Sequence, residues 1–215
     1  MLVRDGWKYV DQSAQTPREQ WHKSARGNHW YVPCAKFAKE KLGAGRGSLL
    51  VIGSPIFEAK EHEAAGWEVT YLDVRQPPVQ FHKVIQACAT QIPLPDQSFD
   101  AVTSNCVLTH AGLGRYGDPV VENGDELMLA EIARVMKPAT GAALTFGPVV
   151  SGKPVQFGNI HRIYTVEEAK RMCTKAGLHI KDTRIWGVVR NKWVDTATED
   201  RNNVDYLCVA VGRPH

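Results

Sequence analysis

From residue 49 onward, short apolar runs alternate with amphipathic segments. The apolar runs at 49–53, 68–73, 84–88 and 99–104 predict buried strands, and a helix of about 56–65 separates the first two. Continuous apolar strands separated by helices are typical of a parallel sheet covered on both faces. The pattern therefore predicts an α/β fold.

The next predicted helix lies in the segment DELMLAEIARVMKP. Its apolar face consists of Leu129, Ile132, Ala133 and Met136. Pro138 is expected to end this helix after Lys137, because proline cannot continue a helical hydrogen-bond ladder. A strand over 142–147 follows.

A second clear helix lies in YTVEEAKRMCTKAG. Thr165 and Glu168 form a capping-box pattern at its start, and Gly177 supplies the end signal. Two further strands, about 179–188 and 204–212, flank a polar segment and suit an antiparallel hairpin at a sheet edge. The expected fold is a Rossmann-like doubly wound sheet of about seven strands, mostly parallel, with that antiparallel edge hairpin.

The 215 residues suffice for one such domain, which we place at 48–215. Residues 1–47 are polar and aromatic and form an N-terminal arm, expected either to cover a ligand or to pack its aromatic side chains onto the sheet. These aromatic residues are Trp7, Tyr9, Trp21, Trp30 and Tyr31.

The net charge of +3 comes from 26 basic and 23 acidic residues, a mixed surface that does not favour nucleic acid. Five scattered cysteines without a C-x-x-C pair argue against a disulfide framework and a zinc site. The chain shows no membrane span and no apolar core of a signal peptide, so we expect a cytoplasmic protein without a membrane partner. Its oligomeric state is left open.

The turn after the first strand decides the expected ligand. A dinucleotide site has three glycines at G-x-G-x-x-G, and here those positions are Gly53, Pro55 and Glu58. Proline removes an amide donor and a carboxylate repels a pyrophosphate. S-adenosylmethionine carries no phosphate, and its ribose diol suits Asp73, 20 residues after Gly53. We therefore place Gly53, Ser54, Pro55, Asp73 and Val74 at an S-adenosylmethionine site.

The segment CATQIPLPDQSFDAVTSNCVLTH, followed by ARVMKP and GAALTFGP, resembles the middle of a class I S-adenosylmethionine-dependent methyltransferase over residues 48–187. The stretches GLGRYGDP and NIHRIYT further resemble a methyltransferase-like domain family of unknown function. The resemblance implies that Cys88, Ala89 and Thr90 line the adenine pocket and that Ser104 and Asn105 lie near the methionine moiety. Many family members have an acidic residue where Cys88 stands and a G-x-G turn where this chain has Gly-Ser-Pro.

Methyl transfer demands no fixed catalytic motif, because aligning and desolvating the nucleophile supplies much of the acceleration. An alcohol or phenol acceptor needs a base, for which we rank His110 first and His161 second. The competing interpretation of His110 is a histidine that packs its loop. A metal held by Asp118 with His110 or His161 is the weaker alternative, because no spacing motif supports it.

The glycine-rich loop after His110 suits acceptor binding. Arg115 and Tyr116 lie in this loop, and Arg162 is a second candidate to hold an acidic group of the acceptor. Ion pairs offer the competing interpretation: Arg115 with Asp118 or Glu122, and Arg162 with Glu167 or Glu168.

The leading hypothesis is therefore a methyltransferase acting on an O- or N-nucleophile of a small polar molecule. An RNA or protein methyltransferase is the second, with Trp21, Trp30 and Tyr31 as recognition residues, although the Asp-Pro-Pro-Tyr motif of many base-methylating enzymes is absent. A non-catalytic Rossmann-like binding or scaffold protein is the third. A dehydrogenase that holds NADP through Arg75 is the fourth.

Overall fold

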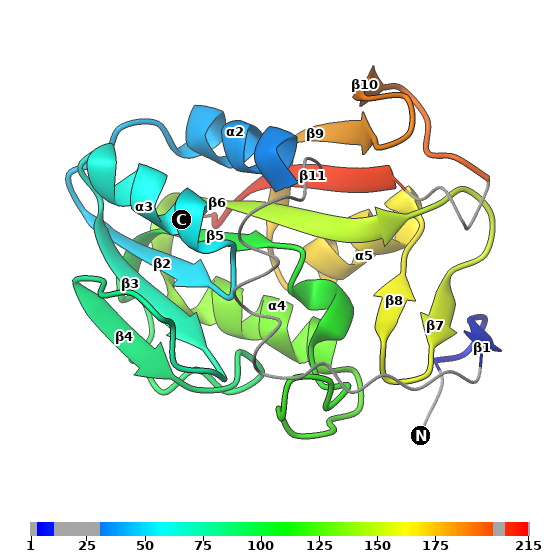
Figure 1. Ribbon diagram of the computed structural model, residues 1–215, viewed down its shortest axis with the longest axis horizontal. Coiled ribbons are helices and arrows are strands. Elements are labelled where there is room, and N and C mark those ends of the chain that lie inside the picture. The colour runs from blue at the N-terminus through cyan, green and yellow to red at the C-terminus, as the bar shows by residue number, and fades with distance from the viewer. Residues whose placement is uncertain (1–3, 11–30, 200–204, 215) are drawn as a thin grey trace.

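The computed structural model describes residues 4–10, 31–199 and 205–214. Its main element is an eight-stranded sheet with the order β10-β9-β11-β6-β5-β2-β3-β4 (Figure 1). Five neighbouring strands are parallel: β2 (Ser48–Ile52), β3 (Glu68–Asp73), β4 (Lys83–Gln86), β5 (Phe99–Asn105) and β6 (Met136–Val149). The other three, β9 (His179–Gly187), β10 (Lys192–Val194) and β11 (Asp205–Gly212), continue it with antiparallel pairs. The predicted fold class is confirmed.

Helices cover both faces of this sheet, as Figure 1 shows. On one face lie α2 (Tyr31–Leu42) and α3 (Ile56–Ala64), and on the other α4 (Gly124–Val135) and α5 (Val166–Lys175). Alternate residues of β2 accordingly enter different cores, Leu50 with the α4 and α5 side and Leu49 with the α3 side. Burial on both faces explains why these strands are apolar throughout.

The helix over 125–137 was predicted too long. It ends at Val135, and Met136 already begins β6, so no loop separates the two elements. Pro138 therefore lies within the strand and does not terminate the helix. Met136 is fully buried. An apolar residue suits a buried position at the end of α4 as well as one at the start of β6, so its apolar character does not show which element it belongs to. The start of α5 is as predicted, because the Thr165 side chain accepts a hydrogen bond from Glu168 N at 3.1 Å.

A second sheet of three short strands was not predicted. It joins β1 (Lys8–Val10), β7 (Val155–Phe157) and β8 (His161–Ile163) beside the carboxyl ends of the main strands (Figure 1). The strand β10, which pairs with β9, likewise lies in a segment expected to be a polar loop. Strands of three residues are too short to establish a period of two.

The expected arm, residues 1–47, contains β1 and α2, and residues 11–30 lie outside the described part of the chain. The buried face of α2, which includes Cys34 and Phe37, packs onto the main sheet. Among the described residues, no helix is long and apolar enough to cross a bilayer.

Chain order reverses between β2 and β5, which are neighbours at the centre of the sheet. From β2 the chain moves outward to β3 and β4, and then returns to β5 on the other side. At such a switch point the loops diverge and leave a crevice at the carboxyl ends of the strands.

Candidate active site

A cavity of about 300 Å³ occupies this crevice. Its wall comes from the ends of β2, β3, β4 and β5, the start of α2 and the loop after β5. It brings together most of the residues selected from the sequence: Gly53, Ser54, Pro55, Asp73, Val74, Cys88, Ala89, Thr90, Asn105, His110, Arg115, Tyr116 and Asp118. Ser104, also expected near the ligand, is buried and is not among the lining residues.

The turn after β2 is shaped by Gly53, whose backbone has φ +55° and whose N donates to Leu72 O at 2.8 Å. A Cβ at this position would lie 2.9 Å from Val107 Cγ2, so glycine keeps this part of the cavity open. Ser54 joins the turn to β5, because its Oγ accepts a hydrogen bond from Asn105 N at 2.9 Å.

Glu58 does not have the role expected for it. Its side chain is buried beneath the turn, is not among the cavity-lining residues, and accepts hydrogen bonds from Thr103 Oγ1 and Asn105 Nδ2. Repulsion of a phosphate by a carboxylate facing the ligand is therefore not supported.

At the end of β3, Asp73 is held by its neighbour Arg75. Oδ1 accepts from Arg75 N at 2.8 Å and from Nε at 3.0 Å, and Oδ2 accepts from Nη2 at 3.2 Å. The Arg75 guanidinium also lies 4.5 Å from the centre of the Tyr116 ring. Because Arg75 is committed to Asp73, the hypothesis of an NADP phosphate at Arg75 is weakened.

After β4, Cys88, Ala89 and Thr90 form the wall expected to contact adenine. The thiol of Cys88 and the hydroxyl of Thr90 are 3.1 Å apart, so these two polar groups interact with each other.

His110 lies in the short helix η2 (Leu108–His110) that follows β5. Its Nδ1 is 2.7 Å from Ile160 O, and a carbonyl only accepts, so Nδ1 carries the proton. Burial, followed by the charge of Arg115, lowers the pKa of His110 to about 3. The imidazole is therefore neutral at pH 7, with Nε2 as a hydrogen-bond acceptor, and it is too weak a base to ionise an alcohol.

The loop after η2 is organised by its own side chains. Asp118 accepts hydrogen bonds from Gly114 N and Tyr116 N, which gives it a structural role in this loop. Arg115 donates to Ile160 O at 2.7 Å, the same carbonyl that His110 contacts. The Tyr116 ring packs edge-on against His110.

His161 and Arg162 lie in β8, outside the lining of this cavity. Burial and the charge of Arg115 lower the pKa of His161 to about 4, and its ring centre is 6.4 Å from that of His110. Arg162 is buried and donates to Ala111 O at 2.7 Å, with its Nε 3.7 Å from Asp125 Oδ2. Arg162 therefore lies outside the lining of the candidate cofactor cavity and pairs with Asp125, not with Glu167 or Glu168.

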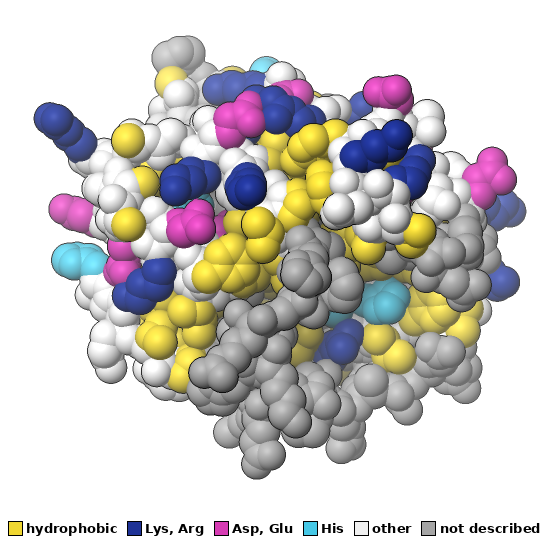
Figure 2. Space-filling model, turned by 45° about the horizontal axis from the view of Figure 1, so that its top comes forward, with side chains coloured by type: hydrophobic (Ala, Val, Ile, Leu, Met, Phe, Trp, Pro, Cys, Tyr) yellow, Lys and Arg dark blue, Asp and Glu magenta, His cyan; other side chains and the backbone are white. Residues whose placement is uncertain are grey.

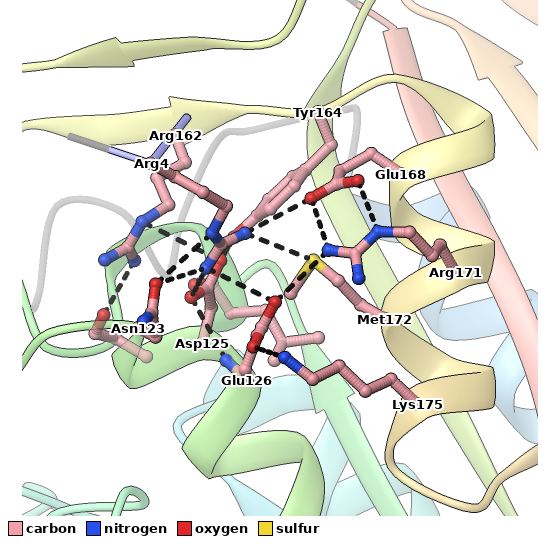
Figure 3. Close-up of polar contacts among 12 residues, drawn as sticks. Arg4, Asn123, Asp125, Glu126, Arg162, Tyr164, Glu168, Arg171, Met172 and Lys175 are labelled. Atoms are coloured by element: carbon pink, nitrogen blue, oxygen red, sulfur yellow. Dashed lines mark hydrogen bonds and ion pairs between the residues drawn. The ribbon is translucent and has the colours of Figure 1, made fainter. Parts of the chain in front are cut away.

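Figure 3 shows the cluster that holds Arg162, in which Arg4 and Tyr164 also reach Asp125. A second cavity of about 320 Å³ borders this cluster and is lined by Arg4 and Arg162. The contacts in the cluster join the N-terminal segment, α4 and β8, which are far apart in the sequence.

Sequence reasoning missed three main lining residues: Tyr31, Cys106 and Val107. Cys106 and Val107 directly follow the predicted strand at 99–104, so their place at its carboxyl end was available as a signal. Tyr31 was named as an aromatic residue of the arm that could cover a ligand or stack on a base, but not as part of the cofactor cavity, and its position at the start of α2 could not be derived from the local pattern.

Residues 53–143 match the model of the methyltransferase domain family. The chain carries a class I S-adenosylmethionine-dependent methyltransferase domain. S-adenosylmethionine is accordingly the cofactor of this enzyme. None of the curated protein sequences matches the chain.

Solved structures with the same fold include the Burkholderia thailandensis 1,6-didemethyltoxoflavin-N1-methyltransferase with bound 1,6-didemethyltoxoflavin and S-adenosylhomocysteine. The two are 14% identical with a TM-score of 0.67, over 96% of this chain and 94% of that one. A methyltransferase in complex with the Haloferax volcanii Trm112 methyltransferase activator is 16% identical, with a TM-score of 0.65 over 94% and 100% of the chains. The [4+2]-cyclase SpnF is also 16% identical, with a TM-score of 0.61 over 88% and 85%.

The methyltransferase cavity fits an adenosyl cofactor on two observations. Gly53 leaves free the space beside Asp73 that a Cβ would fill, and the buried Asn105 Oδ1 has no hydrogen-bond partner among the described residues. Within the described part of the chain, no three His, Cys, Asp or Glu side chains are grouped so that they would hold a metal ion.

Proposed function

We propose that this methyltransferase acts on an O- or N-nucleophile of a small polar molecule. The observation that carries the proposal is that the candidate cofactor residues and His110, Arg115 and Tyr116 line one cavity. A small acceptor bound beside these residues lies next to the methyl donor. The loop carrying Arg115 and Tyr116 forms part of the wall, which supports an enclosed acceptor over a large polymer.

The surface charge supports the same choice. Among the described residues on the face shown in Figure 2, Asp and Glu side chains lie between the Lys and Arg side chains. A nucleic-acid methyltransferase needs a positive surface for the phosphate backbone. Trp21 and Trp30, which the RNA hypothesis uses, lie outside the described residues.

The state of His110 narrows the acceptor class. As a neutral imidazole with Nδ1–H fixed on Ile160 O, it offers Nε2 to an O–H or N–H of the acceptor and so orients the nucleophilic lone pair. Because such a weak base does not ionise an alkyl alcohol, the acceptor supplies its own nucleophilicity. Neutral amines meet this requirement as they are. Phenols and heteroaromatic N–H groups meet it once they have lost their proton, and the nearby positive charge of Arg115 favours that anionic form.

S-adenosylmethionine, when bound, supplies an electrophilic methyl group with a neutral thioether as the leaving group. The chain aligns the nucleophile with that methyl group and excludes water from the cavity, as an in-line displacement requires. Asp73 would accept hydrogen bonds from the ribose hydroxyls, and the wall from Cys88 to Thr90 would contact the adenine. An amine acceptor keeps its proton through methyl transfer and loses it to bulk water once the product has left, whereas an acceptor that ionises gives up its proton before methyl transfer. His110 Nε2 accepts a hydrogen bond and does not hold the proton, because its pKa is about 3.

The experiment is a transfer assay with methyl-labelled S-adenosylmethionine against panels of phenols, amines, heteroaromatic N–H compounds and alkyl alcohols, with transfer RNA in a parallel arm. We expect a product with one of the first three panels. His110→Ala should lower kcat/KM by at least tenfold on that acceptor, whereas His179→Ala, at an exposed position in β9, should leave it unchanged.

Labelling of RNA alone would contradict the small-molecule proposal, and labelling of alkyl alcohols would contradict the role given to His110. Because a [4+2]-cyclase shares this fold, methyl transfer itself has to be measured, not cofactor binding alone.

A further inference from the structure

Glu58 is a buried acid with no place in the reaction described above. It lies in α3 with 1% of its surface exposed, at the position where dinucleotide-binding turns have their third glycine. Its Oε1 accepts from Thr103 Oγ1 at 2.9 Å, and its Oε2 accepts from Asn105 Nδ2 at 2.8 Å. Both partners belong to β5, so the side chain reaches under the turn to the neighbouring strand.

Burial makes this carboxyl costly. It raises the pKa of Glu58 to about 7, although the two hydrogen bonds act in the opposite direction. The adjacent His62, whose Nε2 lies 4.0 Å from Oε1, is no cationic partner, because burial lowers its pKa to about 4. A well-packed apolar side chain is often at least as stabilising as a buried charged group. The retained acid is therefore better explained by what it does to Asn105.

Glu58 determines which way the Asn105 amide faces. Its Oε2 accepts from the Nδ2 of Asn105 at 2.8 Å, and Tyr31 O accepts from the same Nδ2 at the longer distance of 3.5 Å, so Nδ2 points toward these oxygens and Oδ1 points away. The main chain of Asn105 is fixed as well, by the hydrogen bond from its N to Ser54 Oγ. Asn105 lines the cavity, and its Oδ1 is buried without a hydrogen-bond partner among the described residues. A buried acceptor without a partner costs free energy, and a bound ligand that donates a hydrogen bond to it removes that cost.

We propose that Glu58 is a positioning residue that holds the Asn105 amide so that Oδ1 accepts a hydrogen bond from the ammonium group of the methionine part of S-adenosylmethionine. The ammonium is a donor-only cation and therefore matches a carbonyl oxygen, whereas a reversed amide would present two N–H groups to it. The inference rests on S-adenosylmethionine as the cofactor and is independent of the methyl acceptor.

Calorimetric titration with two nucleosides tests this assignment. S-adenosylhomocysteine carries the amino-acid group, whereas 5′-methylthioadenosine has the same adenosine without it. In Glu58→Ala we expect at least tenfold weaker binding of S-adenosylhomocysteine, about 1.4 kcal/mol, and unchanged binding of 5′-methylthioadenosine. Glu58→Gln, whose amide oxygen still accepts from Nδ2, should restore the affinity to within threefold. Glu61→Gln, on the same helix and half exposed, is the matched control.

A general disturbance of the site would weaken both nucleosides equally in Glu58→Ala, and that result would overturn the proposal. Asn105→Ala gives a second test if Glu58→Ala does not fold, and it should lose only the amino-acid-dependent affinity. Glu58→Leu, which removes the acceptor and fills the space, should lose the same affinity in the wild-type background and add no further loss on the Asn105→Ala background. Equal loss of both nucleosides in Asn105→Ala would also overturn it. Wild-type protein that binds neither nucleoside would contradict the cofactor assignment itself, which is a distinguishable failure.

Discussion

Replacing Asp125 by alanine tests the contact network that supports the site. The Asp125 side chain is fully buried, and its carboxylate accepts hydrogen bonds from Arg4 Nη2 at 2.7 Å and from Tyr164 OH at 3.0 Å. Arg162 Nε lies 3.7 Å away. Asp125→Ala therefore leaves the buried Arg162 guanidinium without its carboxylate and removes one of the two acceptors of the buried Tyr164 hydroxyl, which keeps Leu108 O (Figure 3).

The expected loss follows from these contacts. Removing one partner of a buried ion pair costs about 3–5 kcal/mol, and the loss of one of the two acceptors of the Tyr164 hydroxyl adds less than about 1 kcal/mol. Arg4 is partly exposed and regains water, so we expect a total of about 4 kcal/mol. With an m-value of about 2 kcal/mol/M, the urea midpoint should fall by roughly 2 M.

The same substitution should lower activity, because the network also holds η2. Arg162 donates to Ala111 O and Tyr164 donates to Leu108 O, on either side of His110. Urea unfolding followed by circular dichroism gives the stability change. Arg171→Ala, at a half-exposed ion pair, is the control and should cost less than 1 kcal/mol. A loss of under 1 kcal/mol in Asp125→Ala, or an equal loss in the control, would refute the reasoning.

Two further predictions concern pH and the cofactor turn. Burial lowers the pKa values of His62, His110 and His161 to about 4, 3 and 4, so the folded protein binds fewer protons than the unfolded chain below pH 6.5 and is destabilised as the pH falls. Burial raises the pKa of Glu58 to about 7. Above pH 4.5 the folded protein therefore binds one proton at Glu58 that the unfolded chain has lost, and this partly offsets the effect of the histidines. The unfolding free energy should therefore rise between pH 4.5 and 6.5, by at most about 3 kcal/mol per pH unit, and urea midpoints that do not change over this range would contradict it. Gly53→Ala should weaken S-adenosylhomocysteine binding at least tenfold, because its Cβ meets Val107, whereas Gly152→Ala, which also has a positive φ but open space around the Cβ, should only lower stability; equal calorimetric affinities in the two variants would exclude this explanation.

The sequence was sufficient for the long strands of the main sheet and for α3, α4 and α5, because long buried strands and amphipathic helices have distinct periods. It did not predict α2 or the short strand β10. The sequence was insufficient at positions where the same type of residue suits both a helix and a strand. Met136 is apolar and buried whether it ends α4 or begins β6, and Ala139, with φ +61°, gave no signal of the bend that follows. The three-residue strands β1, β7 and β8 depend on their pairing with each other, which no local pattern specifies.

Some residues of the candidate site could likewise be predicted from the sequence, whereas others could not. Gly53, Asp73 and Asn105 were predictable because the carboxyl ends of neighbouring parallel strands meet at one edge of a sheet. Arg162 was not, because its partners Asp125 and Ala111 are 37 and 51 residues away in the chain. A charged residue in a loop or short strand gives no local indication of whether it faces a cavity or a buried partner.

The departures from a glycine-rich turn are accounted for by the polar contacts beneath it. In a dinucleotide site, glycines bring the backbone close to the pyrophosphate and the helix close to the strand. Here Ser54 Oγ binds Asn105 N and Glu58 binds the Asn105 amide, so side chains connect the turn, α3 and β5. A turn held in this way needs only one glycine, at Gly53, where the backbone has a positive φ and the cavity requires space. Glu58, at the position of the third glycine, is thus used to join α3 to β5 and does not face the ligand. The packing of this turn therefore depends on side-chain hydrogen bonds where a dinucleotide turn depends on glycines.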